Sequence, residues 1–169
     1  MNTYKNKNVK CTFIIHKESE TNAETLEKKV GEKIPDIELS KEFNLVYVYY
    51  LVDKKIQYPI FESDVLYIGK TNGQKHNQKK SAAFRFVHLR EGQDYKQNIT
   101  LRHLYEKGCV IGLDIIEVEN CKDVEKSWRY EFLNTYGALP IADGASYSKE
   151  KGFINKSTDE AVDDLMDNK

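Results

Sequence analysis

Two apolar stretches decide the fold, FNLVYVYYLV at residues 43–52 and VLYIG at residues 65–69. Both are dense in β-branched and aromatic side chains, which is typical of β-strands. A polar connection that contains Pro59 separates them, and the sequence TNG follows Gly69. We therefore predict that the two strands pair as an antiparallel hairpin and that the second strand stops at Gly69.

The rest of the central region supplies one more strand and several helices. Residues 110–119 alternate as a third strand should, and residues 81–90 have helical spacing. Residues 101–108 and 123–137 also read as helices, and each is closed by a glycine. In the last helix we expect one apolar stripe, made of Val124, Trp128, Phe132 and Thr135. The predicted fold is a mixed α/β domain of the α+β type, a small three-stranded antiparallel sheet flanked by helices.

Outside this core the chain divides into two further segments. Residues 1–42 form an amino-terminal extension packed on the core, with a short strand at 10–15 and a helix at 21–33. We expect Thr21 or Asn22 to cap that helix. The domain itself spans 43–156, and an acidic tail follows at 157–169.

Composition places the chain among ordinary globular proteins. Its 169 residues are 40% hydrophobic and 31% charged, which fits one folded domain. Three cysteines without a CxxC pair favour a reducing cytoplasm and argue against a cysteine zinc site. The start of the chain carries no long apolar stretch, so we expect neither a signal peptide nor a membrane partner.

Charge is distributed unevenly although the net charge is only -1. The tail at 157–169 holds five acids and one lysine, whereas residues 70–90 hold six basic residues and no acid. Such a local field can attract phosphates whatever the total charge. A solvated lysine-rich loop explains the charges alone equally well. The candidate substrate-binding residues in and around this segment are Lys70, Lys75, Lys79, Lys80 and Arg90.

Several short pieces follow one another in a recognisable order. They are Asn44-Leu45-Val46-Tyr47, Leu66-Tyr67-Ile68-Gly69-Lys70-Thr71-Asn72-Gly73, Arg85 with His88, Glu131, and Tyr136-Gly137-Ala138-Leu139-Pro140. This order resembles the GIY-YIG nuclease family over residues 43–143, and LYIGKTNG is its most specific piece. Leu45 stands where the family has a glycine, and Asp143 falls near a family asparagine.

The resemblance implies a divalent-metal-dependent endonuclease that hydrolyses DNA phosphodiester bonds. By position, Tyr47 and Tyr67 look like the two motif tyrosines, and the family register sets them opposite each other. Arg85 looks like the arginine that clamps the phosphate, with His88 one helical turn further on. Glu131 looks like the ligand of one Mg²⁺ or Mn²⁺.

The chemistry of these residues agrees with that assignment. Phosphodiester hydrolysis needs an activated water, a cation and charge compensation. Glu131 borders the apolar stripe of its helix, where a carboxylate needs a cation or a donor. An oxygen ligand suits Mg²⁺ or Mn²⁺. The alternative is a glutamate that reaches solvent or pairs with a lysine.

The remaining candidates carry proton transfer and phosphate binding. Arg85 and His88 share a helix face, and the arginine fork matches two phosphate oxygens. Tyr47 can act as a base only if the metal, Lys70 or Arg85 favours phenolate, because a phenol has a pKa near 10. His88 is the second candidate for the same proton transfer. Taken singly, strand tyrosines are usually core residues.

The sequence thus predicts a cytoplasmic endonuclease of restriction or phage type. An enzyme that cuts both strands at a specific site would act as a homodimer. Two alternatives stay open. One is a nucleic-acid-binding module of the same fold without catalysis, and the other is a protein-interaction domain.

Overall fold

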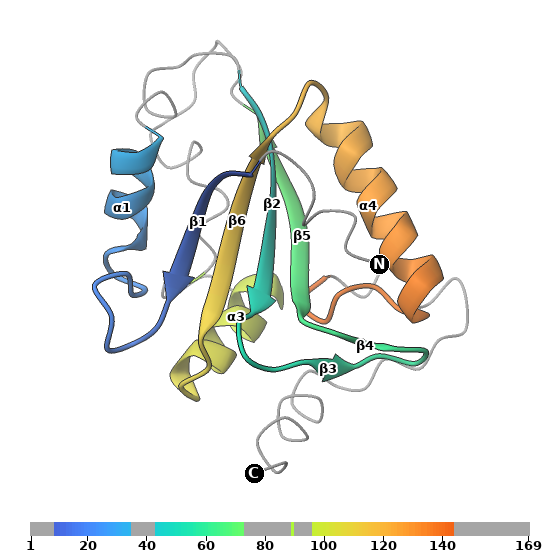
Figure 1. The fold of residues 1–169 in the computed structure, drawn as a ribbon, viewed down its shortest axis with the longest axis horizontal. Coiled ribbons are helices and arrows are strands. Elements are labelled where there is room, and N and C mark those ends of the chain that lie inside the picture. The colour runs from blue at the N-terminus through green and yellow to red at the C-terminus, as the bar shows by residue number, and fades with distance from the viewer. Residues whose placement is uncertain (1–8, 35–42, 73–88, 90–95, 144–169) are drawn as a thin grey trace.

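The computed structural model describes residues 9–34, 43–72, 89 and 96–143. Its main sheet has four strands in the order β1-β6-β2-β5, each antiparallel to its neighbours, and a small second sheet pairs β3 with β4. Figure 1 shows the elements in chain order. They are β1 (Val9–Ile15), α1 (Leu26–Lys33), β2 (Asn44–Leu51), β3 (Ile56–Gln57), β4 (Glu62–Ser63), β5 (Val65–Asn72), α3 (Lys96–Glu106), β6 (Ile111–Glu117) and α4 (Cys121–Tyr136).

The mixed α/β class and the antiparallel hairpin of β2 with β5 are confirmed. The number of strands was wrong, because β1 belongs to the sheet and pairs along β6 instead of packing on it as an extension. The physical reason lies in its alternation. Phe13 and Ile15 are buried on one face while the residues between them are exposed, so β1 serves as the half-buried edge strand that β6 requires.

The predicted end of the second strand was also wrong. β5 continues through Gly69 to Asn72, and Thr71 pairs with Leu45 of β2. Gly69 does not adopt a positive φ, so its backbone is that of an ordinary strand residue. The absence of a side chain at Gly69 serves packing, as the site below explains. The predicted polar connection between the two strands also contains the β3–β4 hairpin.

The helix ends follow local hydrogen bonding. Asn22 accepts hydrogen bonds from the backbone N–H groups of Glu24 and Thr25, but regular helix α1 begins later than expected, at Leu26. Asn120 caps α4 by accepting from the N–H groups of its first turn. Gly137 ends α4 at φ 79°, a left-handed conformation that glycine adopts without strain. Apart from Leu89, the helix predicted at 81–90 lies outside the described residues, as does the tail at 157–169.

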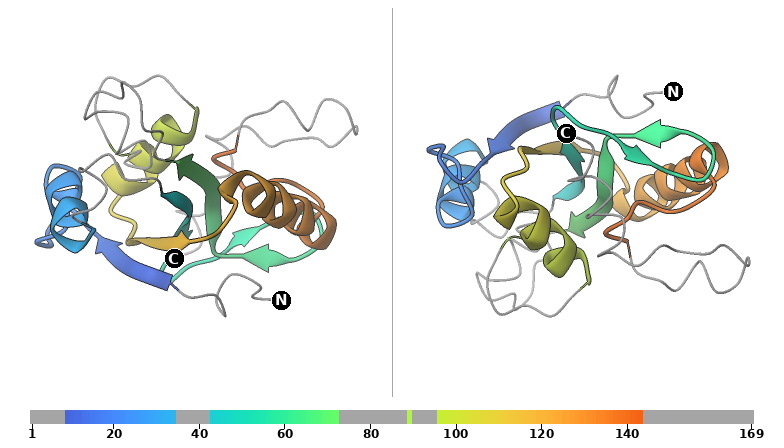
Figure 2. Two further views of the ribbon diagram at one scale, coloured as in Figure 1. Left: turned by 90° about the horizontal axis from the view of Figure 1, so that it is seen from above. Right: turned by 90° about the horizontal axis from the view of Figure 1, so that it is seen from below.

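The helices are distributed around the twisted sheet. Helix α1 lies at the β1 side and α4 runs along the β5 side (Figure 1), while α1 and α3 share one side of β1 and β6 (Figure 2). Apolar residues of α1 and α3, such as Val30 and Leu104, are fully buried in the same core as the sheet. No described helix is both long and apolar enough to cross a membrane. The edge of β5 that faces α4 carries the residues of interest.

Candidate active site

A pair of tyrosines marks the place where β2 meets β5. Tyr47 and Tyr67 have ring centroids 6.0 Å apart and planes tilted by 44°. The expectation that they stand directly opposite each other was wrong, since Tyr47 pairs with Gly69 and Tyr67 pairs with Tyr49. The two tyrosines are diagonal neighbours on one face, a separation that aromatic rings can bridge. The two rings therefore meet because the ring of Tyr47 lies over Gly69, its partner on β5.

Gly69 makes that crossing feasible. A Cβ built at this position would lie 2.5 Å from both Cζ and Oη of Tyr47, and 2.6 Å from Cε1 of Tyr67. Carbon atoms at such distances overlap strongly, so a larger residue would displace the pair. The glycine of the YIG triplet is thus needed for the space that its missing side chain leaves, and not for a turn.

Burial and a hydrogen bond set the protonation of the pair. Tyr47 is only 3% exposed, and burial is the largest cause that raises its pKa well above the usual value. Burial, followed by the negative charge of Asp143, raises the pKa of Tyr67 to about 12. A hydrogen bond between the two side chains raises the pKa of Tyr47 and lowers that of Tyr67, so Tyr47 acts as the donor. Tyr67 is the less buried phenol, and the hydrogen bond that it accepts makes it the easier of the two to ionise.

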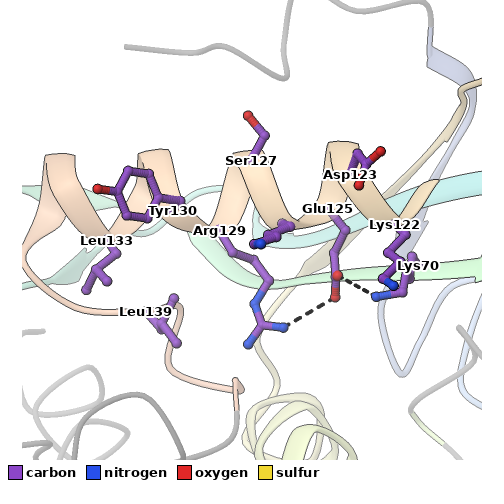
Figure 3. A pocket seen from close by; sticks show the side chains of 10 residues that line it. Lys70, Lys122, Asp123, Glu125, Ser127, Arg129, Tyr130, Leu133 and Leu139 are labelled. Atoms are coloured by element: carbon purple, nitrogen blue, oxygen red, sulfur yellow. Dashed lines mark hydrogen bonds and ion pairs between the residues drawn. The ribbon is translucent and has the colours of Figure 1, made fainter. Parts of the chain in front are cut away.

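A network of four charged side chains adjoins the tyrosines. Glu125 of α4 receives Lys70 Nζ at 2.6 Å and Arg129 Nη1 at 3.3 Å, and Arg129 Nε lies 2.9 Å from Asp143 Oδ2. The carboxylate of Glu125 is 10% exposed, so its charge is held in a poorly solvated place by two cations. Figure 3 shows Lys70 and Arg129 reaching Glu125 from opposite sides.

The tyrosine pair and the charged network influence each other. The negative charge of Glu125 raises the pKa of both Tyr47 and Tyr67, and the guanidinium of Arg129 lowers that of Tyr67. These side chains come from β2, β5 and α4, so the fold gathers them from three separate parts of the sequence. Two phenols, two cations and a poorly solvated carboxylate are therefore close enough for their charges to influence one another.

A pocket of about 420 Å³ opens along α4 next to this network. Polar and charged residues dominate the end near Lys70 and Glu125, whereas Leu133 and Leu139 lie at the other end, with Arg129 between them (Figure 3). Neither Tyr47 nor Tyr67 is among the residues that line it. The full lining is Lys70, Lys122, Asp123, Glu125, Lys126, Ser127, Arg129, Tyr130, Leu133 and Leu139.

Of the predicted site residues, the structure brings Tyr47 and Tyr67 into contact, and it places Lys70 in an ion pair with Glu125, whose charge acts on both tyrosines. Glu131 is half-buried on α4 and does not line the pocket. Six positions separate it from Glu125, which is a rotation of about 240° around the helix, so the two carboxylates leave α4 on different sides.

Sequence reasoning missed Glu125 and Arg129. The predicted apolar stripe was displaced, since Val124 and Thr135 are only half-buried. The residues that face the protein are spaced by four, three and four positions along α4, and they are Cys121, Glu125, Trp128 and Phe132. A glutamate at a stripe position next to Cys121 and Trp128 was the available signal, because a buried carboxylate requires partners. Arg129, four residues later, is the expected partner on a helix.

Six predicted residues cannot be placed relative to this site, because they lie outside the described residues. They are Lys75, Lys79, Lys80, Arg85, His88 and Arg90.

The described residues can be tested for their fit to a divalent cation. No group of three or more His, Cys, Asp or Glu side chains in the described ranges could hold a metal ion. A hydrated Mg²⁺, however, keeps several waters and is commonly held by one or two carboxylates. Glu125 borders the pocket and offers such a carboxylate, although a cation would compete there with Lys70 and Arg129.

Comparison with protein-family models, curated proteins and solved structures found no match for this chain.

Proposed function

We propose that this chain is a divalent-metal-dependent endonuclease of the GIY-YIG kind that hydrolyses DNA phosphodiester bonds. The observation that carries the proposal is the contact of the motif tyrosines Tyr47 and Tyr67 across Gly69, beside the shielded carboxylate of Glu125. The LYIGKTNG motif supplies Tyr67 and Gly69 to this contact and Lys70 to the ion pair with Glu125. Two cations and a poorly solvated carboxylate next to a phenol pair support a functional site.

Each residue has a distinct part in the proposed reaction. Tyr67, once it has lost its own proton to solvent, would accept the proton of the attacking water, and Tyr47 would assist by donating its hydrogen bond to the Tyr67 oxygen. Lys70 and Arg129 compensate the charge that develops on the phosphate. A bound Mg²⁺ would polarise the phosphate and acidify a coordinated water. This arrangement moves the acceptor role from Tyr47, for which the sequence argued, to its less buried neighbour.

We further propose Glu125, instead of Glu131, as the carboxylate that holds the cation. Glu125 borders the pocket and its charge acts on both tyrosines, whereas Glu131 leaves the helix on another side. On substrate entry, a phosphate can take over Lys70 or Arg129 and release an oxygen of Glu125 for the metal. The carboxylate of Glu125 thus becomes available to a metal ion when an anion binds the cations in its place.

Matched glutamine variants of the two glutamates test the function and the assignment together. Glu125→Gln should abolish Mg²⁺-dependent nicking of a plasmid, because an amide keeps the shape but supplies no charge to a cation. Glu131→Gln, on the same helix, should retain cleavage, and a chelator should stop the unmodified protein. Thermal unfolding of both variants controls for folding. Loss of cleavage in Glu131→Gln alone would return the metal to Glu131, and no cleavage by the parent protein under any divalent cation would refute the nuclease.

One observation favours a second candidate, a DNA-binding module without catalysis. Glu125 is already neutralised by Lys70 and Arg129, which is what a site that never binds metal would require. Such a module would bind DNA at low salt with equal affinity in the presence and absence of Mg²⁺ and would leave the plasmid intact. A restriction or phage enzyme that cuts both strands would in addition form a homodimer on its site, which sedimentation with a duplex would detect.

A further inference from the structure

We propose that the pocket along α4 binds one unstacked nucleotide of the DNA strand, with its base at the Tyr130 end and its phosphate at the Lys122 end. The inference rests on the proposed function for the identity of the substrate. It adds a binding surface on α4 that shares Lys70 with the basic segment at 70–90, where the sequence placed the DNA. The pocket has about 420 Å³ of space, which lies in the usual range for sites that hold a small molecular unit.

The charges of the pocket favour a phosphate. Four of its lining residues are cationic and two are acidic. Lys70 and Arg129 are engaged by Glu125 and Asp143, but Lys122 and Lys126 form no ion pair with any other residue in the described part of the chain. Both lysines are exposed. The surplus positive charge therefore belongs to two side chains that are available for a backbone phosphate.

The other end of the pocket favours a base. Tyr130 is 59% exposed although it is a large aromatic residue, and it lines the pocket together with Leu133 and Leu139. Figure 3 shows these three side chains at the end away from Lys70. An exposed ring beside apolar side chains is the arrangement on which nucleobases stack, and every base offers a π face to it.

The helix geometry places the two kinds of contact in line. Lys122, Lys126 and Tyr130 follow one another at intervals of four residues, so they share a face of α4. The distance from the first to the last is about 12 Å along the axis. Charge and ring are thus separated along one face, so backbone and base are contacted by different residues. A base in this pocket cannot remain stacked in a duplex, so the site requires a single-stranded or locally opened substrate.

Fluorescence anisotropy with a labelled single-stranded oligonucleotide tests the site, at low salt and with chelator so that no cleavage occurs. Tyr130→Ala should weaken binding about tenfold, within the range for the loss of one stacked base. Tyr130→Phe keeps the ring and should bind as the parent does. Phe61→Ala is the matched control, because Phe61 is 60% exposed on the β3–β4 hairpin and does not line the pocket.

A double lysine variant tests the charged end of the pocket. Lys122→Ala with Lys126→Ala should flatten the slope of log affinity against log salt by roughly one to two, about one for each lost phosphate contact. Lys28→Ala is the control, since Lys28 is a strongly exposed lysine on α1 at the far side of the sheet.

The possible outcomes distinguish a failure of the pocket from a failure of the proposed nuclease activity. Binding that depends on Tyr130, in a protein that does not nick plasmid in a separate assay with divalent cations, would support the pocket and refute the proposed function. Unchanged affinity in Tyr130→Ala, or an equal loss in Phe61→Ala, would overturn the pocket even if the protein cuts DNA. A mononucleotide that competes as well as the oligonucleotide would show a site for free nucleotides, and a preference for intact duplex would exclude an unstacked base.

Discussion

Replacement of Gly69 by alanine probes the tyrosine pair directly. The added Cβ would meet Cζ and Oη of Tyr47 at 2.5 Å, well inside van der Waals contact. Tyr47 cannot retreat easily, because it is 3% exposed and its ring meets that of Tyr49 edge-on at a centroid distance of 6.3 Å. Overpacking of this kind costs about 1 to 3 kcal/mol of unfolding free energy. For a domain of this size we expect a fall in Tm of roughly 2 to 12 °C.

Gly112→Ala is the matched control for that variant. A Cβ at Gly112 would lie 2.2 Å from Cζ of Tyr50, so the ring of a β2 tyrosine crosses a strand glycine there too. That contact is on β6 and involves neither Tyr47 nor Tyr67. Both variants should therefore lose stability to a similar degree. Only Gly69→Ala should also lose cleavage at a temperature where both proteins remain folded.

Chemical unfolding in urea measures the first effect and plasmid nicking the second. In a double-mutant cycle, Tyr47→Ala should remove most of the cost of Gly69→Ala, because the atoms that clash are gone. An unchanged unfolding free energy in Gly69→Ala would refute the reasoning, since the Tyr47 ring could not then cross this position. Equal loss of cleavage in both glycine variants would show that activity follows stability and not the tyrosine contact.

Three further predictions follow from the same residues. Tyr47→Phe should lower single-turnover cleavage by about 10²-fold or more, because its hydroxyl serves Tyr67, whereas Tyr49→Phe should retain nearly full activity; the reverse order would contradict the strand register. Replacing Lys79 and Lys80 by alanine should flatten the log-affinity against log-salt slope by roughly one to two, and an unchanged slope would mean that this loop is merely solvated. The pKa of Tyr67 is about 12 in the folded protein and about 10 in the unfolded chain. The contribution of Tyr67 to the free energy of unfolding is therefore fully present below about pH 10 and is lost as the pH rises toward 12. The free energy of unfolding, measured in urea between about pH 9 and 11, should therefore fall less steeply with pH in Tyr67→Phe than in the parent protein. An identical fall would show that Tyr67 does not contribute to the loss of stability at alkaline pH.

The sequence was sufficient for those parts of the fold that local pattern determines. The antiparallel hairpin of β2 and β5 and the end of α4 at Gly137 were predicted and are confirmed. The position of β1 beside β6 was not predicted, because pairing between strands about 100 residues apart leaves no local trace. Gly69 misled the prediction for a related reason. A glycine can end a strand or can leave space for a neighbouring aromatic ring, and only the residues around it in the folded protein show which role it has.

Prediction of the site was limited by the phase of one helix. The predicted stripe shared Trp128 and Phe132 with the buried face but took Val124 and Thr135 in place of Cys121 and Glu125, so Glu125 was assigned to the solvent side and Glu131 to the border of the core. In the structure Glu125 belongs to the buried side and Arg129 follows it by one turn. A count of hydrophobic residues ignores a polar residue within a buried stripe. Glu125, which pairs with two cations, was therefore missed.

The burial of Tyr47 determines how the tyrosine pair would work. Ionising a phenol that is almost fully buried, beside a second phenol and the negative charge of Glu125, is strongly opposed. The same burial makes Tyr47 a rigid hydrogen-bond donor, since its ring is held by Tyr49 on one side and by the flat surface of Gly69 on the other. A donor fixed in this way stabilises negative charge on Tyr67, and the guanidinium of Arg129 acts in the same direction. Proton transfer at Tyr67 therefore depends on Tyr47 without requiring Tyr47 to ionise. A cation bound at Glu125 would offset the negative charge that raises the pKa of Tyr67, so that the base would become effective only once the metal is in place.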